Sequence, residues 1–187
     1  MASLASMATT ILLARHGETD WNLERRVQGH TDRPLNGTGH AQALALAKTL
    51  AHEPLEAVYA SDLSRAYETA RAVAEPRRLP VRTLPELREK DFGTWEGLTD
   101  EEILSRFPDA RRGHWGDGET HEDVAGRVVA ALRTIAERHP GATVLVVSHG
   151  GPLRAVLSHC SAAGDGPIEN CHVARLEIEG VDFRWLD

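Results

Sequence analysis

Short apolar runs that stop abruptly at polar residues are the clearest pattern along this chain. The run at residues 11–14 ends at Arg-His-Gly, the run at 57–60 ends at Ser-Asp, and the run at 143–147 ends at Ser-His-Gly-Gly-Pro. Apolar runs of this length, closed by glycine and polar residues, are typical of buried strands that lead into loops. Further strands are expected at residues 79–84, 172–178 and 182–186, the last two as a terminal hairpin.

Between these runs, apolar residues recur every three or four positions, which is the spacing of an amphipathic helix. The longest such segment follows Thr120, a suitable N-cap, and ends at a Pro-Gly pair. Asp62 is expected to cap a helix over residues 63–75, which Pro76 ends. Other helices are expected at residues 38–52, 99–107 and 153–159. Because strands and helices mostly alternate, we predict an α/β fold with a mostly parallel central sheet flanked by helices.

The composition is that of an ordinary globular protein, with 41% hydrophobic and 26% charged residues. A chain of 187 residues suits a single domain with a sizeable core. We expect this domain to span residues 9–187, after a flexible N-terminal extension at residues 1–8. Either Met1 or Met7 is compatible with the native start.

Several features argue against a membrane or nucleic-acid partner. No apolar stretch approaches the roughly 20 residues that a membrane span needs, and residues 1–10 lack the basic and long apolar regions of a signal peptide. The formal net charge of −7 disfavours non-specific binding to nucleic acid. The two cysteines, Cys160 and Cys171, are too few for a disulfide framework. They fit a reducing compartment, so we expect a cytoplasmic protein.

Basic side chains follow three of the predicted strands. Arg15 and His16 follow the first, Arg65 lies shortly after the second, and His149 follows the most hydrophobic one. Ligands of open α/β sheets bind outside the carboxyl ends of the strands, so these side chains converge if the three strands are neighbours. A helix beginning near Gly151 would add backbone N–H groups and the positive end of its dipole. Arginine forks suit phosphoryl oxygens and a neutral imidazole is a competent nucleophile, so the pattern predicts a phosphoryl site.

Six segments, in order along nearly the whole chain, resemble the motifs of the histidine phosphatase superfamily, the phosphoglycerate-mutase-like proteins. In one of them Thr120 stands where the family has serine. The compact form resembles the broad-specificity phosphatases, the α-ribazole phosphatases, and the sugar-phosphate or phosphoglycerate phosphatases. The segments are 15–19 with Trp21-Asn22; Gln28-Gly29 with Asp32, Pro34 and Leu35; 59–66 with Thr69-Ala70; 87–89 with 92–93 and 95–97; 118–120 with Val124 and Arg127; and 147–151.

The resemblance implies that His16 is the nucleophile and becomes a phosphohistidine, while Arg15, Arg65 and His149 clamp the phosphoryl oxygens. The chemistry of the residues agrees. His16 must be unprotonated to attack, and two neighbouring arginines disfavour its charged form. Phosphoryl transfer spreads charge over the equatorial oxygens, so fixed cations supply most of the catalysis. We therefore expect neither a metal nor a cofactor, and the other eight histidines show no metal-ligand spacing.

The resemblance also implies that Glu89 protonates the leaving oxygen and then takes a proton from the hydrolytic water. An alkyl phosphate has a poor leaving group, so a general acid is required. Because this acid must be protonated, a mildly acidic to neutral optimum is expected. From the residues alone, the nearby Glu86 and Asp91 remain alternative acids. The secondary phosphate contacts that the resemblance implies are Asn22, Gln28 and the backbone N–H of Gly150.

The sequence thus predicts a metal-independent phosphomonoester hydrolase with a phosphohistidine intermediate. Two alternatives stay open, a cofactor-dependent phosphoglycerate mutase and a catalytically silent phosphate-binding module. Hydrolysis is favoured because only 60 positions separate Glu89 from His149, too few for the insertion that helps mutases to close the site, and little chain follows the last strand. A serine-hydrolase elbow around Ser148 fits poorly, because Val146 stands where that motif has glycine.

The expected partner is a small phosphomonoester, whose identity the sequence leaves open. The wall of the substrate site is expected to combine the loop at residues 111–118 with Arg26, His30 and Arg33 on the other side. The terminal hairpin offers an exposed strand edge, which would suit pairing in a homodimer.

Overall fold

The computed structural model describes residues 7–110, 116–161 and 167–186, and within them the chain forms one six-stranded sheet. The strand order is β3-β2-β4-β1-β5-β6, with β1 to β4 parallel and the hairpin β5–β6 antiparallel at one edge. This confirms the expected mostly parallel α/β fold. The strands are β1 (Thr9–Arg15), β2 (Leu55–Ala60), β3 (Val81–Thr83), β4 (Thr143–Ser148), β5 (Val173–Glu179) and β6 (Asp182–Trp185).

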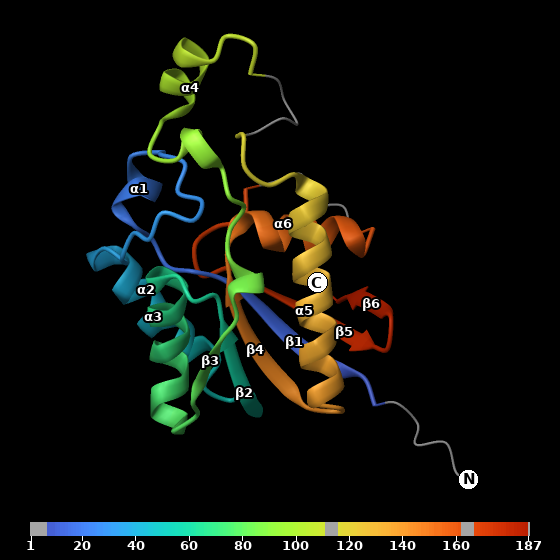
Figure 1. Cartoon of the computed structure of the whole chain (residues 1–187). Helices are drawn as coiled ribbons and strands as arrows, with labels where there is room; N and C mark the ends of the chain where they lie inside the picture. Colours follow the sequence, from blue (N-terminus) through green and yellow to red (C-terminus); the bar gives the residue numbers. More distant parts are fainter. Residues whose placement is uncertain (1–6, 111–115, 162–166, 187) are drawn as a thin grey trace.

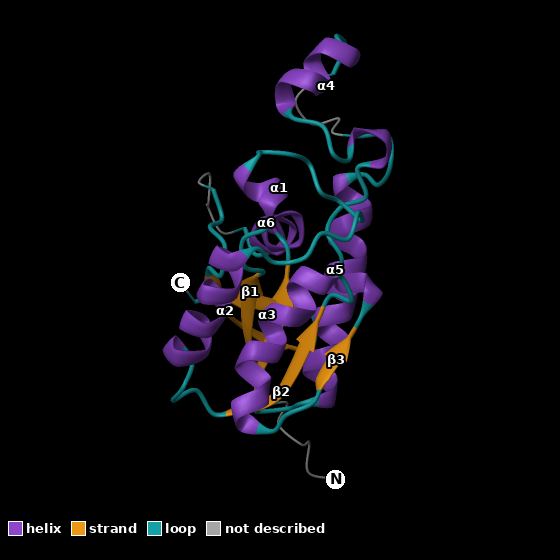
Figure 2. Ribbon diagram, turned by 90° about the vertical axis from the view of Figure 1, so that its left-hand side faces the viewer, coloured by secondary structure: helices purple, strands orange, loops and turns teal. Residues whose placement is uncertain are grey.

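The helices form a layer on each face of the sheet (Figures 1 and 2). Helices α2 and α3 cover one face, α5 and α6 cover the other, and α1 and α4 lie beyond one end of the sheet. Short 3₁₀ turns occupy Glu75–Arg77, Pro85–Leu87 and Gly93–Trp95. The helices are α1 (Asp20–Leu23), α2 (Gly37–Thr49), α3 (Ser64–Ala74), α4 (Asp100–Arg106), α5 (His121–Arg138) and α6 (Gly150–His159).

Two hydrophobic clusters explain why the central strands are continuous apolar runs. Along β1, Ile11 and Leu13 point into the cluster with α5 and α6, while Leu12 and Ala14 point into the cluster with α2 and α3. Alternate side chains of a strand face opposite sides of the sheet, so a strand covered on both faces must be apolar at every position. The neighbouring β4 is buried in the same way. The polar residues of β1 and β4, such as Arg15 and Ser148, lie at the strand ends.

The expected cap of α3 is wrong. Asp62 does not cap the helix, because its carboxylate accepts two hydrogen bonds from Arg88, at 2.7 and 2.6 Å. The first N–H of α3, that of Ser64, is satisfied instead by Asp32 from a distant loop, at 2.8 Å. The expected end of the helix is confirmed within a residue, because α3 ends at Ala74 and Pro76 lies in the separate 3₁₀ turn that follows.

The other elements agree with the expected pattern within a few residues. The side chain of Thr120 caps α5 as predicted, and α6 begins at Gly150, three residues earlier than expected. Among the described residues, no helix combines the length and apolar character needed to cross a membrane. Most of the expected extension, residues 1–6, lies outside the described part.

Candidate active site

The three polar strand ends meet at one place because β2, β4 and β1 are adjacent in the sheet. Arg15 at the end of β1 is in register with Ser148 at the end of β4. One residue further on, the rings of His16 and His149 meet edge to face, with centroids 5.1 Å apart. Arg65 lies in the first turn of α3, after β2. The predicted convergence of basic residues is therefore confirmed.

His16 is held in the form that a nucleophile needs. Its ring is buried, and Nδ1 lies 2.6 Å from the carbonyl oxygen of Gly17. A carbonyl oxygen only accepts, so Nδ1 carries the proton and Nε2 keeps its lone pair. Burial lowers the pKa of His16 well below its usual value, and the charges of Arg65 and Arg15 lower it further. The imidazole is therefore neutral at neutral pH.

Four buried nitrogen atoms around His16 have no hydrogen-bond partner within the described chain. They are Nε of Arg15, Nε of Arg65 and both ring nitrogens of His149. The arginine nitrogens are donors, and the neutral ring of His149 has one donor and one acceptor. A buried polar atom without a partner costs about 1–3 kcal/mol, so these four atoms indicate a site built for a ligand. The four nitrogens belong to three side chains, two arginines and one histidine, so the fitting ligand is an anion with several oxygens, such as a phosphoryl group.

The two arginines are fixed by backbone carbonyl oxygens rather than by acids. Arg65 is fully buried and donates to the carbonyl oxygens of Thr31 at 3.1 Å and Gly29 at 2.8 Å. Arg15 donates to the carbonyl oxygen of Ile168 at 2.5 Å. Burial lowers the pKa of Arg65 to about 10, which still leaves it charged at neutral pH. Because neutral carbonyl groups hold them, both cations keep their charge available for an anionic ligand.

Glu89 is the acidic residue that reaches this group. Its two carboxylate oxygens accept from the backbone N–H of Gly151, at 3.1 and 3.2 Å, at the N-terminus of α6. By contrast, Glu86 is exposed, and Asp91 accepts from Gly93 at 2.8 Å outside the cluster of basic residues. Arg15 and Arg65 also experience the charge of Glu89, and neither experiences that of Glu86 or Asp91 to a comparable extent. The geometry therefore favours Glu89 over the two alternatives.

Arg127 of α5 holds the segment that carries Glu89. Its guanidinium donates to the carbonyl oxygens of Glu86, Arg88 and Glu89, at 2.8, 2.7 and 2.8 Å. Glu119 accepts two further hydrogen bonds from the same guanidinium, at 2.7 and 2.8 Å. The sequence placed Arg127 and Glu119 in a motif without indicating a role. The structure shows that they brace the segment from behind.

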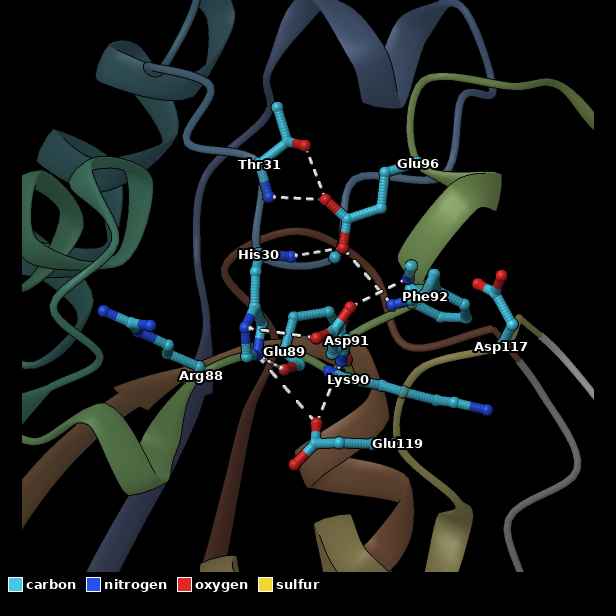
Figure 3. Close-up of polar contacts among 12 residues, drawn as sticks. His30, Thr31, Arg88, Glu89, Lys90, Asp91, Phe92, Glu96, Asp117 and Glu119 are labelled. Carbon is cyan, nitrogen blue, oxygen red and sulfur yellow. Dashed lines mark hydrogen bonds and ion pairs between the residues drawn. The ribbon is translucent and has the colours of Figure 1, made fainter.

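A second brace reaches Glu89 from the loop after α1 (Figure 3). The carboxylate of Glu96 accepts from the backbone N–H groups of His30 and Thr31, both at 2.8 Å, and from that of Phe92 at 3.2 Å. The ring Nε2 of His30 lies 2.9 Å from the carbonyl oxygen of Glu89. These contacts join the loop that holds Arg65 to the segment that carries Glu89. Nothing in the local sequence pattern indicated them.

The three residues expected to make secondary phosphate contacts are placed by different local interactions. Asn22 forms the capping box of α1 with Thr19, and Gln28 is buried with its Oε1 accepting from the Thr19 hydroxyl at 2.9 Å. Gly150 is the first residue of α6, so its N–H belongs to the helix N-terminus, where such groups lack intrahelical partners. Asn22 and Gln28 come after the carboxyl-terminal end of β1, and Gly150 comes after that of β4.

The expected substrate wall is largely occupied by internal contacts. Arg26 is paired with Glu24 and Glu102, both at 2.8 Å, and the guanidinium of Arg33 lies 5.1 Å from the ring centroid of Trp21. Residues 111–115 of the expected loop lie outside the described residues. Arg26 is therefore engaged in ion pairs and His30 serves the brace described above, while Nε of Arg33 is buried without a hydrogen-bond partner in the described chain.

Ser148 is not placed as a hydrolase nucleophile. Its hydroxyl is fully buried and donates to the carbonyl oxygen of Leu87 at 2.7 Å. An elbow serine has its hydroxyl exposed at the top of the sheet. Here the hydroxyl ties β4 to the segment before Glu89, so the serine-hydrolase alternative has no support.

Comparison with known proteins agrees with this site. The family model of the histidine phosphatase superfamily, branch 1, matches residues 11–186. The chain is similar to the uncharacterized phosphatase PhoE of Bacillus subtilis, at 33% identity over 94% of this chain and 89% of the relative. It is also similar to the metal-independent phosphoserine phosphatase of Arabidopsis thaliana, at 37% identity over 97% of this chain and 80% of the relative.

A solved structure shares the fold almost throughout. Bacillus stearothermophilus YhfR superposes with a TM-score of 0.87 at 37% sequence identity, and the match covers 95% of each chain. The family match, the relatives and the site geometry lead to the same conclusion: the chain belongs to branch 1 of the histidine phosphatase superfamily and is a phosphatase.

Proposed function

We propose that His16, Arg15, Arg65, His149 and Glu89 form the catalytic machinery of a phosphomonoester hydrolase that acts on a small phosphorylated metabolite. The observation that carries this proposal is the set of unpartnered buried nitrogens around the neutral ring of His16. A nucleophile is thus surrounded by unpartnered donors that suit the oxygens of a phosphoryl group.

In the first step, Nε2 of His16 attacks phosphorus and the bond to the ester oxygen breaks. Arg15, Arg65 and an N–H of His149 hold the three phosphoryl oxygens as charge spreads over them. Glu89 gives its proton to the departing alkoxide, which leaves as the alcohol. The enzyme then carries a phosphohistidine and an ionised Glu89.

In the second step, Glu89 accepts a proton from water while the water oxygen attacks phosphorus. The bond between phosphorus and Nε2 of His16 breaks, phosphate leaves, and Glu89 is protonated again for the next turnover. The same clamp stabilises both transition states. Asn22, Gln28 and the N–H of Gly150 add secondary contacts to the phosphoryl oxygens. The clamp supplies the positive charge, so this cycle calls on no metal ion.

The substrate is proposed to be a cytoplasmic metabolite. Cys160 and Cys171 are free thiols, as expected in a reducing compartment. A relative is named as a phosphoserine phosphatase, so phosphoserine is the first physiological candidate to assay.

The test is hydrolysis of p-nitrophenyl phosphate between mildly acidic and neutral pH, with a metal chelator present. Wild type and His40→Ala, which changes an exposed histidine on α2, should turn over equally, and His16→Ala should show no turnover. Full inhibition by the chelator, or activity of His16→Ala comparable to wild type, would contradict the proposal.

A second assay separates hydrolysis from mutase activity. Supplied with 3-phosphoglycerate, a hydrolase releases inorganic phosphate, whereas a mutase forms 2-phosphoglycerate. Phosphate release is the expected result. Isomerisation without phosphate release would favour the mutase instead.

A further inference from the structure

One arginine beside the site takes no part in the contacts described so far. Arg154 lies one turn after Gly150 in α6, and residues four apart share one face of a helix. Its Nη1 atom lies 3.9 Å from the point that a Cβ on Gly150 would occupy. Nε of Arg15 and Oε2 of Glu89 each lie 3.9 Å from that same point. Nη1 of Arg154 therefore lies at most twice 3.9 Å from Nε of Arg15 and from Oε2 of Glu89, at the edge of the phosphate clamp.

Arg33 lies against the ring of Trp21, and three other arginines near the site are already paired with acids. These pairs are Arg26 with Glu24 and Glu102, Arg88 with Asp62, and Arg127 with Glu119. Figure 3 shows the side chain of Arg88 directed away from Glu89.

Arg154 is exposed and, within the part of the chain that the structure describes, it makes no ion pair or hydrogen bond. Burial is the main cause that lowers the pKa of Arg15, and the charge of Arg154 lowers it further, whereas the charge of Glu89 raises it. The two cations are therefore close enough to repel each other. Arg154 is therefore a charge available to the substrate, at the edge of the phosphoryl site.

We propose that Arg154 selects substrates by binding a carboxylate that lies a few bonds away from the phosphate ester. A guanidinium fork matches a carboxylate in charge and in geometry, because two N–H groups meet its two oxygens. A single cation suits a singly charged group better than a second phosphate. This inference rests on the proposed phosphatase activity and adds to it the class of substrate, a small phosphorylated carboxylic acid.

The test compares two pairs of substrates that differ by one carboxylate. Phosphoserine is paired with phosphoethanolamine, and 3-phosphoglycerate with glycerol 3-phosphate. We expect wild type to have the higher kcat/KM for the acid of each pair. Arg154→Gln should lose about tenfold or more for the acids, equivalent to about 1.4 kcal/mol, and stay within about twofold for their partners. Arg154→Lys should recover part of the loss, because it keeps the charge without the fork.

The matched control is Arg138→Gln, which removes an exposed arginine from the last turn of α5, away from the active site. This variant should behave as wild type on all four substrates. Equal losses on both members of each pair, no loss with Arg154→Gln, or a wild type without preference for the acids would overturn the inference.

Turnover of p-nitrophenyl phosphate, which has no carboxylate, distinguishes failure of the Arg154 inference from failure of the phosphatase proposal. If wild type and Arg154→Gln hydrolyse it and His16→Ala does not, the phosphatase proposal stands whatever the ratios between paired substrates. If wild type does not hydrolyse it, the proposed function itself fails, and the inference fails with it.

Discussion

The two buried histidines should make the stability of the fold sensitive to mild acid. Burial lowers the pKa of both His16 and His149 well below the usual value, with Arg65 and Arg15 lowering it further. In the unfolded chain a histidine titrates near pH 6.5. Below that pH the unfolded state binds a proton that the folded state does not bind. The free energy of unfolding therefore falls as the pH falls.

The size of this effect follows from the linkage relation. Between pH 7 and pH 5.5, a histidine that stays neutral in the folded state and has an unfolded pKa of about 6.5 lowers the free energy of unfolding by about 1.3 kcal/mol. Both rings are fully or almost fully buried, so solvent screening requires little discount. Together, His16 and His149 should account for a loss of about 2.5 kcal/mol.

Urea denaturation at the two pH values measures this loss. The buffer must be free of phosphate, because an anion that binds the folded site stabilises it. His149→Gln should lose about 1.3 kcal/mol less than wild type over this pH interval. His40→Gln, in which the replaced histidine is exposed in the folded state, should lose as much as wild type. If His149→Gln and wild type lose the same amount, His149 does not remain neutral in the folded protein and the reasoning is wrong.

Three further predictions concern the acid and its support. Glu89→Gln should lower kcat/KM for alkyl phosphates by about 10²–10⁴-fold and for aryl phosphates much less, because kcat/KM reports the phosphorylation step, in which a good leaving group needs no proton; equal losses of kcat/KM would move the acid role elsewhere. Arg127→Gln should shift Glu89 by removing three carbonyl contacts, lowering kcat/KM for alkyl phosphates while kcat/KM for p-nitrophenyl phosphate changes little; an unchanged kcat/KM for both would refute the bracing role. Gly151→Ala should do the same, since its Cβ would lie 2.2 Å from Oε1 of Glu89, whereas Gly126→Ala, with open space around the added atom, should leave both rates unchanged.

The parts of the fold that were predictable depend on local burial. The runs at residues 11–14, 57–60 and 143–147 correspond to β1, β2 and β4, which are covered on both faces and are therefore mostly apolar along their central stretches. Polar residues therefore had to come at the carboxyl-terminal ends of these strands, where the chain leaves the core. This physical constraint made Arg15 and His149 visible from the sequence alone.

The interactions that were not predictable join residues far apart in the chain. Asp62 looks like a helix cap because the residues after it form a helix, but the ion pair with Arg88, 26 residues away, takes its carboxylate. Arg127 binds backbone carbonyl oxygens some forty residues upstream, and such acceptors leave no trace in side-chain patterns. Local propensity cannot rank a distant charged partner against a nearby backbone N–H.

The measurement that most directly tests the central claim is detection of the phosphorylated enzyme. Glu89→Gln lacks the base that activates water, so its phosphoenzyme should persist after mixing with p-nitrophenyl phosphate. The mixture is quenched in alkali, where phosphohistidine is stable, and the peptides are analysed by mass spectrometry. We predict one phosphoryl group on the ring of His16, and none in the double variant that also carries His16→Ala. A phosphoryl group on another residue, or continued turnover with unmodified His16 throughout, would contradict the account.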